Sequence, residues 1–140
     1  MQPAASSQGR SSVATDDAAR ILIVEDDYLA ATEIEAALIE GGFEVAGIAH
    51  SAEHAVQLAK TERPTLAVMD IRLASRRDGI EAALEIFQET GIRCIFATAH
   101  HDTEMRSRAQ PAAPLGWLPK PYSMHSLLLL VRQALAQLRA

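Results

Sequence analysis

The stretch ILIVEDD at residues 21–27 changes directly from four apolar residues to three acidic ones. A short apolar run rich in isoleucine and valine is typical of a parallel strand that is buried on both faces. Apolar residues then recur at helical spacing from Ala30 to Leu38, and Gly41 follows where a helix C-cap is expected. A buried strand, an acidic turn and an amphipathic helix form the first half of a βαβ unit.

The rest of the chain repeats this alternation. Four further strands are predicted over residues 43–49, 66–69, 92–97 and 115–118. Helices are predicted from Ser51 to Pro64, from Ile80 to Gly91, over 103–109 and from Ser123 nearly to Ala140. Because right-handed crossovers place helices on both faces of a parallel sheet, the sequence predicts an α/β fold, a doubly wound, five-stranded parallel sheet with five helices.

Composition indicates one globular domain over residues 20–140. The 140-residue chain is 49% hydrophobic and 22% charged, which suffices for a packed core. Residues 1–19 lack apolar periodicity and are interpreted as a disordered tail. No segment suits a signal peptide or a transmembrane span, so we expect a cytoplasmic protein without membrane partners. A net charge of -5 argues against nucleic acid as a partner.

Polar residues close four of the predicted strands: Glu25, Asp26 and Asp27 the first, Asp70 the third, Thr98 the fourth and Lys120 the fifth. The carboxyl ends of parallel strands lie at one edge of the sheet, so these side chains should converge. Clustered carboxylates repel one another unless a cation compensates them, and an all-oxygen set suits Mg²⁺. A lysine and a hydroxyl donor beside them fit phosphoryl transfer, with Asp70 able to act as the nucleophile.

Structural roles are expected for several other polar residues. Asp27 is interpreted as the N-cap of the first helix. Cys94 stands within an apolar run and is predicted to be a buried strand residue rather than a reactive thiol. Four histidines could be considered as metal ligands, but no cysteine or third histidine stands at ligand spacing beside them. We therefore interpret them as solvated side chains: His50, His54, His100 and His101.

Five segments of the chain resemble the receiver domains of bacterial two-component response regulators: ILIVEDD at 21–27, LAVMDIRL at 66–73, DGIEA at 78–82, FATAH at 96–100 and WLPKPY at 117–122. They occur in the family's order with family-like spacing and extend the resemblance over residues 20–140. The resemblance implies the flavodoxin-like receiver fold and a single-domain response regulator. Such a protein is not an enzyme beyond catalysing its own phosphorylation and dephosphorylation.

The resemblance also implies a role for each residue of the site. Asp70 would accept a phosphoryl group from a sensor histidine kinase or a phosphotransfer protein. Thr98 would contact that group, and Lys120 corresponds to the family's lysine, followed by a cis peptide bond to Pro121. Mg²⁺ would be bound by Glu25 (often through water), Asp26, Asp70 and the backbone carbonyl of Arg72.

Phosphorylation in the family switches the face formed by the fourth helix, the fifth strand and the last helix, and a downstream protein reads the change. Thr98 would be coupled to the aromatic residue of the fifth strand, here Trp117, where most relatives carry Tyr or Phe. The loop over 74–77 is longer and more basic than is common in the family. Arg72 and His100 occupy positions where relatives tune the lifetime of the phosphorylated state.

Alternatives remain open on the sequence alone. The domain is alternatively a receiver-like interaction module that does not depend on phosphorylation. A flavin carrier or a phosphatase on a similar fold is a second competitor, although three acids stand where a flavin carrier needs a Ser/Thr/Gly-rich phosphate loop. The apolar run from Leu127 to Val131 cannot face one sheet entirely, so one edge should be exposed or covered by a homodimer partner.

Overall fold

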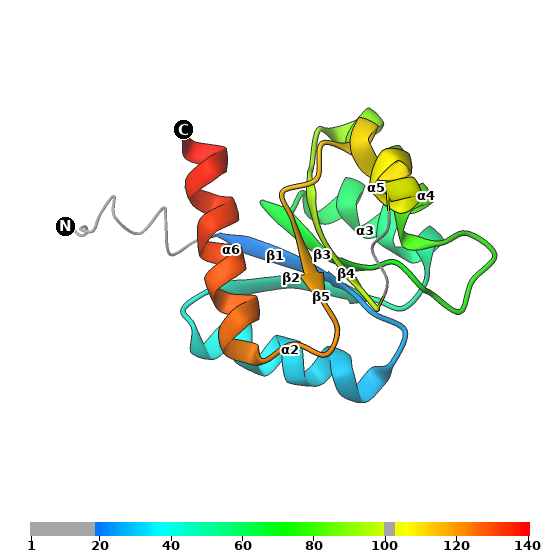
Figure 1. Ribbon diagram of the computed structural model, residues 1–140. Helices are drawn as coiled ribbons and strands as arrows, with labels where there is room; N and C mark the ends of the chain where they lie inside the picture. Colours follow the sequence, from blue (N-terminus) through cyan, green and yellow to red (C-terminus); the bar gives the residue numbers. More distant parts are fainter. Residues whose placement is uncertain (1–18, 100–102) are drawn as a thin grey trace.

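The computed structural model describes residues 19–99 and 103–140 and contains five strands that alternate with helices (Figure 1). The strands are β1 (Arg20–Val24), β2 (Glu44–Ala49), β3 (Leu66–Asp70), β4 (Cys94–Thr98) and β5 (Gly116–Pro119). The helices are α2 (Tyr28–Glu40), α3 (Ala52–Glu62), α4 (Gly79–Thr90), α5 (Thr103–Ala109) and α6 (Met124–Arg139), with a 3₁₀ turn, η1 (Gln110–Ala112), after α5. The predicted alternation of five strands and five helices is confirmed.

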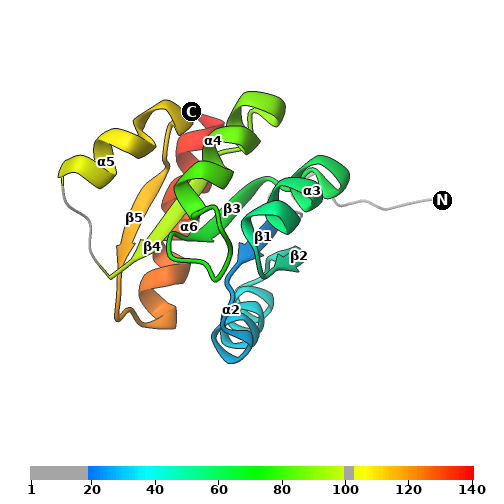
Figure 2. The ribbon, with the colours of Figure 1, turned by 90° about the vertical axis from the view of Figure 1, so that its right-hand side faces the viewer.

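All neighbouring strands pair in parallel, in the order β2-β1-β3-β4-β5. Helices α2 and α6 cover one face of the sheet, and α3, α4 and α5 cover the other (Figures 1 and 2). Each face has its own hydrophobic cluster, and every residue of β3 and β4 is buried. This order makes β1 and β3 neighbours, with Val24 opposite Met69, so the residues that follow them emerge side by side.

Several local predictions can be compared with the structure. The Asp27 carboxylate accepts hydrogen bonds from the amides of Leu29 and Ala30, at 3.0 and 3.2 Å, which confirms Asp27 as the N-cap of α2. Cys94 is 1% exposed and therefore buried as predicted. The fourth strand begins two residues later than expected, because the Ile92 amide donates to the Thr90 hydroxyl and pairing with β3 starts at Cys94.

The last helix resolves the apolar run that the sequence left ambiguous. Leu127 and Val131 are fully buried under the sheet, whereas Leu129 is 49% exposed. The flanking Leu128 and Leu130 are partly buried and lie over Gly41 and Gly116. The expected exposed edge is therefore present, and dimerisation through it stays a prediction.

Two predictions concern residues at or beyond the limits of the described chain. The predicted tail over 1–19 lies outside the described residues except for Ala19, which is buried and whose carbonyl accepts a hydrogen bond from the Glu44 amide. His100 and His101 also lie outside them. None of the helices within 19–99 and 103–140 is both long and apolar enough to cross a membrane.

Candidate functional site

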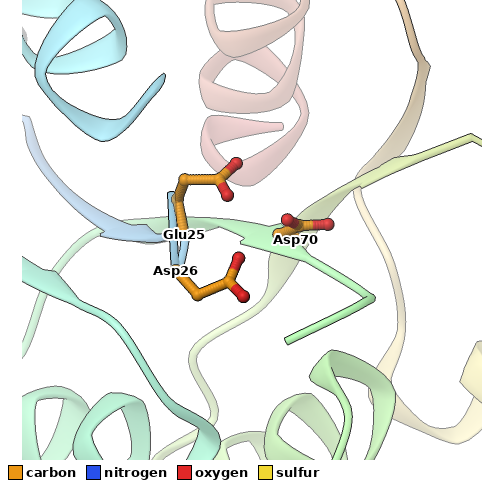
Figure 3. Close-up of side chains that lie close together, drawn as sticks. All are labelled: Glu25, Asp26 and Asp70. Atoms are coloured by element: carbon orange, nitrogen blue, oxygen red, sulfur yellow. The ribbon is translucent and has the colours of Figure 1, made fainter. Parts of the chain in front are cut away.

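Three carboxylates meet where β1 and β3 end. Glu25 and Asp26 follow β1, and Asp70 is the last residue of β3. One oxygen from each of the three lies within 4.8 Å of the others, and Figure 3 shows the groups gathered beyond the strand ends. Glu25 and Asp70 are only 5% and 4% exposed, and Asp26 is more accessible. The topology thus gathers acids that are separated by more than forty residues in sequence.

This cluster is electrostatically unfavourable without a cation. Burial, and to a lesser degree the neighbouring Asp70 carboxylate, raises the pKa of Glu25 to about 7, although the Asp27 amide donates a hydrogen bond to its Oε2 at 3.0 Å. A divalent cation would remove this cost, since it favours the ionised form of each carboxylate. The donors are all oxygens, which suits Mg²⁺ better than a softer metal. The residues present therefore fit a hard divalent ion.

Asp70 also has cationic and amide partners. The Lys120 ammonium lies 3.2 Å from Asp70 Oδ1, and the backbone amide of Arg72 donates to the same oxygen at 3.3 Å. Lys120 is held at the end of β5 by its amide, which donates to the Thr98 carbonyl at 2.9 Å. The Lys120–Pro121 peptide bond is cis, as the resemblance implies. Asp70 is thus the meeting point of the acidic cluster and the lysine.

A small pocket opens beside Asp70 and is lined by Asp70, Ile71, Arg72, Thr98, Ala99, Met105 and Lys120. Thr98 is 5% exposed, and its hydroxyl donates to the Met105 sulfur across 3.6 Å. The pocket therefore combines a buried carboxylate, a cation and a hydroxyl around one space. An anion joined to Asp70 would find both a charge partner and a hydrogen-bond donor there.

Trp117 lies on β5 opposite Phe96, and their ring centroids are 5.1 Å apart. The Arg106 guanidinium of α5 lies 5.0 Å from the centroid of the Trp117 ring, within cation–π range. Trp117 is partly buried against the cluster on the α3–α5 face of the sheet. The aromatic residue is therefore in contact with both the sheet and α5.

The loop after Asp70 is fastened to the strand that carries it. The Gly79 amide donates to the Ile71 carbonyl at 2.7 Å, and a Cβ added to Gly79 would lie 2.1 Å from the Asp70 carbonyl oxygen. Asp78 begins α4 with a capping box, in which its carboxylate accepts from the Glu81 amide and its amide donates to the Glu81 carboxylate. Only glycine permits this close approach of helix and strand.

Arg77, one of the two arginines in the loop over 74–77, is paired locally. The Arg77 guanidinium lies 2.7 Å from a Glu85 carboxylate oxygen, and the Ser75 hydroxyl donates to the Arg77 carbonyl. The Ala52 amide donates in turn to Ser75 Oγ, which ties the loop to the start of α3. These contacts hold the loop between α3 and α4.

The structure brings all of the predicted site residues to one edge of the sheet: Glu25, Asp26, Asp70, Arg72, Thr98 and Lys120. Sequence reasoning assigned no role to Asp78, Gly79 or Met105. The spacing of Asp78 and Glu81 is that of a capping box and could have identified the helix start. For Met105, no pattern in the sequence signals its contact with Thr98.

Comparison with known proteins shows what this arrangement resembles. A family model of the response regulator receiver domain matches residues 21–132. The chain is 34% identical to the transcriptional regulatory protein PdtaR of Mycobacterium tuberculosis, over 86% of this chain and 58% of PdtaR. It is also 34% identical to the phyllosphere-induced regulator PhyR of Methylorubrum extorquens, over 88% of this chain and 46% of PhyR. The chain spans about half the length of these curated relatives.

Solved structures give the same result. The signal receiver domain of a modulated diguanylate cyclase from Desulfovibrio desulfuricans G20 has a TM-score of 0.77 at 33% identity, covering 86% of this chain and 95% of that one. A CheY-like response regulator receiver domain protein from Methanospirillum hungatei JF-1 has a TM-score of 0.79 at 26% identity, with the same coverage. The fold, the family model and the relatives agree, and this chain belongs to the family of response regulator receiver domains.

Proposed function

We propose that this chain is a response regulator that accepts a phosphoryl group on Asp70 and passes the change to a protein partner through α5, β5 and α6. Receiver domains are generally signalling regulators rather than enzymes, and they interact with kinases or phosphotransfer proteins. The observation that carries the proposal is the buried Asp70 carboxylate, placed between the acidic cluster and the Lys120 ammonium.

The chemistry follows from what surrounds Asp70. An Asp70 oxygen attacks the phosphorus of a phosphohistidine in line with the departing imidazole, so an O–P bond forms as the P–N bond breaks and the histidine keeps the electron pair. Lys120 balances negative charge on the phosphoryl oxygens, and Thr98 donates its hydroxyl to one of them. Since the groups are already placed, catalysis is largely positioning and charge compensation.

Mg²⁺ is the proposed cofactor. Receiver domains bind Mg²⁺ through acidic residues, and this chain has the corresponding cluster. Asp26, Asp70 and the Arg72 carbonyl would hold the ion, with Glu25 acting through water. When bound, the ion supplies positive charge to the phosphoryl oxygens. The raised pKa of Glu25, which burial causes first and the neighbouring Asp70 carboxylate increases, supports this assignment because a bound cation would favour the ionised form of the cluster.

The proposed phosphodonor is a sensor histidine kinase or a phosphotransfer protein, and the proposed site of action is the cytoplasm. PdtaR is named as a transcriptional regulatory protein and PhyR as a regulator, so signalling through protein contacts is the proposed output. An interaction module independent of phosphorylation remains the alternative, and the intact set of acids, Thr98 and Lys120 favours the phosphorylated switch over it.

A small-molecule phosphodonor tests the proposal without the cognate kinase. Wild-type protein is incubated with phosphoramidate in Mg²⁺ or in EDTA, and intact-protein mass spectrometry records the gain of one phosphoryl group. We expect a hydroxylamine-sensitive gain that requires Mg²⁺ and is absent in Asp70→Asn. Asp78→Asn serves as a control aspartate outside the acidic cluster and should retain the gain. Wild-type protein that never gains a phosphoryl group would favour the interaction module.

A further inference from the structure

Helix α5 is held in place mainly by side-chain contacts rather than by buried surface. Of its seven residues, all of which the structure describes, Ala109 alone is buried. Three of the others contact three different elements: Met105 contacts Thr98 of β4, Arg106 lies over Trp117 of β5, and Arg108 reaches the start of α4. Such a helix shifts at lower cost than one anchored in the core.

The contact of Arg108 is an ion pair with Asp78. Arg108 Nη2 lies 3.0 Å from Asp78 Oδ2 and 3.3 Å from Oδ1, so both carboxylate oxygens are engaged. Asp78 is itself fixed as the N-cap of α4, and the next residue, Gly79, is hydrogen-bonded to Ile71 beside the nucleophile. The pair therefore ties α5 to the loop that begins at Asp70.

The position of the Thr98 hydroxyl connects this ion pair to phosphorylation. In the structure the hydroxyl donates to Met105, whereas in the proposed function it donates to a phosphoryl group on Asp70. Met105 and Arg108 are three residues apart and so lie on the same side of α5. A rearrangement that separates Thr98 from Met105 and shifts α5 would therefore also pull Arg108 away from Asp78.

We propose that the Arg108–Asp78 ion pair is a latch that holds α5 in the unphosphorylated arrangement and sets how readily the domain switches. Arg108 is a positioning residue, and this inference rests on the proposed function. A contact made in only one of two states biases the equilibrium by the full value of that contact. Side chains that are 45% and 31% exposed form an ion pair of modest strength, equivalent to about a two- to fivefold shift.

The test compares the affinity for beryllofluoride, a phosphoryl analogue, among matched variants in Mg²⁺. Binding is followed by the fluorescence of Trp117, the only tryptophan of the chain. We expect Arg108→Met to bind about two- to fivefold more tightly than wild type, and Arg108→Lys to lie between them. The difference should shrink in high salt, because a part-exposed ion pair is screened. Lys60→Met is the control, since it removes a comparable exposed ion pair, with Glu89, between α3 and α4.

Denaturant unfolding of the same variants measures what the ion pair contributes to stability, and both a latch and a merely structural contact predict a lower stability for Arg108→Met. The beryllofluoride affinity separates the two readings: an Arg108→Met affinity that is unchanged or weaker than that of wild type overturns the latch. An equal tightening in Lys60→Met would also overturn it, because the effect would not be specific to α5. Failure of wild-type protein to bind beryllofluoride at all would contradict the proposed function, and the latch with it.

Discussion

Replacing Gly79 by alanine should damage the fold and the site together. The added Cβ would lie 2.1 Å from the Asp70 carbonyl oxygen and 2.9 Å from Ile71 Cα. These are backbone atoms, so no side-chain rotation relieves the clash, whereas ordinary carbon contacts are about 3.5–4.0 Å. Either the start of α4 or the end of β3 must move by roughly 1 Å or more, and the Gly79–Ile71 hydrogen bond of 2.7 Å is then lost or stretched.

The expected loss of stability follows from these terms. Overpacking costs about 1–3 kcal/mol and the hydrogen bond about 1 kcal/mol. Alanine offsets up to about 1 kcal/mol of this loss, because its helix propensity is higher than that of glycine. We therefore expect Gly79→Ala to lower the free energy of unfolding by about 1–4 kcal/mol in urea titrations. Mg²⁺ affinity, followed by Trp117 fluorescence, should fall by about tenfold or more because Asp70 is displaced.

Gly91 provides the matched control. It ends α4 in the left-handed region, with φ of 79°, and a Cβ added there meets nothing within 4 Å. Gly91→Ala should therefore cost about 1–2 kcal/mol through backbone strain alone and leave Mg²⁺ affinity unchanged. A Gly79→Ala protein with wild-type stability and wild-type Mg²⁺ affinity would refute this account of the close packing of α4 against Asp70.

Three further predictions concern charges and caps. In metal-free buffer, unfolding free energy should fall as pH rises from about 4.5 to about 7, because folded Glu25 keeps its proton up to a pKa of about 7 whereas the unfolded chain releases it near 4.5. Glu25→Gln should remove on the order of 3 kcal/mol of this change, and an unaltered pH slope would contradict the assignment. Lys120→Met should slow phosphoryl uptake from phosphoramidate by at least about tenfold while Mg²⁺ affinity holds or rises, because a competing cation is gone; an unchanged rate of uptake would exclude a role for the lysine. Asp27→Ala should cost about 1 kcal/mol in thermal unfolding and spare Mg²⁺ affinity, and a loss of that affinity would instead make Asp27 a ligand.

The sequence predicts the architecture because short apolar runs alternate clearly with segments in which apolar residues recur at helical spacing. Buried parallel strands appear as apolar runs, and four of the five predicted runs are followed by polar residues at the sheet edge. The positions of Asp70 and Thr98 at strand ends therefore follow from the same pattern that predicts the strands. Boundaries are less determined: the fourth strand begins at Cys94 rather than Ile92, because a threonine hydroxyl captures the Ile92 amide.

The contacts made by α5 were not predictable in this way. The Arg108–Asp78 pair joins residues thirty positions apart, and an exposed arginine on a short helix has many available partners. The contact of Thr98 with Met105 depends on where α5 lies, which neither residue type reveals.

The buried face of α2 was predicted with a shift of one residue. The apolar residues at helical spacing were predicted to begin at Ala30, but Ala31 is the fully buried residue. Two consecutive alanines make the inner face of the helix ambiguous.

The central claim is that Asp70 itself carries the phosphoryl group. Protein treated with phosphoramidate and Mg²⁺ is reduced with borohydride, which converts an aspartyl phosphate to homoserine, and tryptic peptides are sequenced by mass spectrometry. The account predicts homoserine at position 70, with Asp26 and Asp78 unmodified. Homoserine at another acidic residue, or at none while the protein remains folded and binds Mg²⁺, would contradict it.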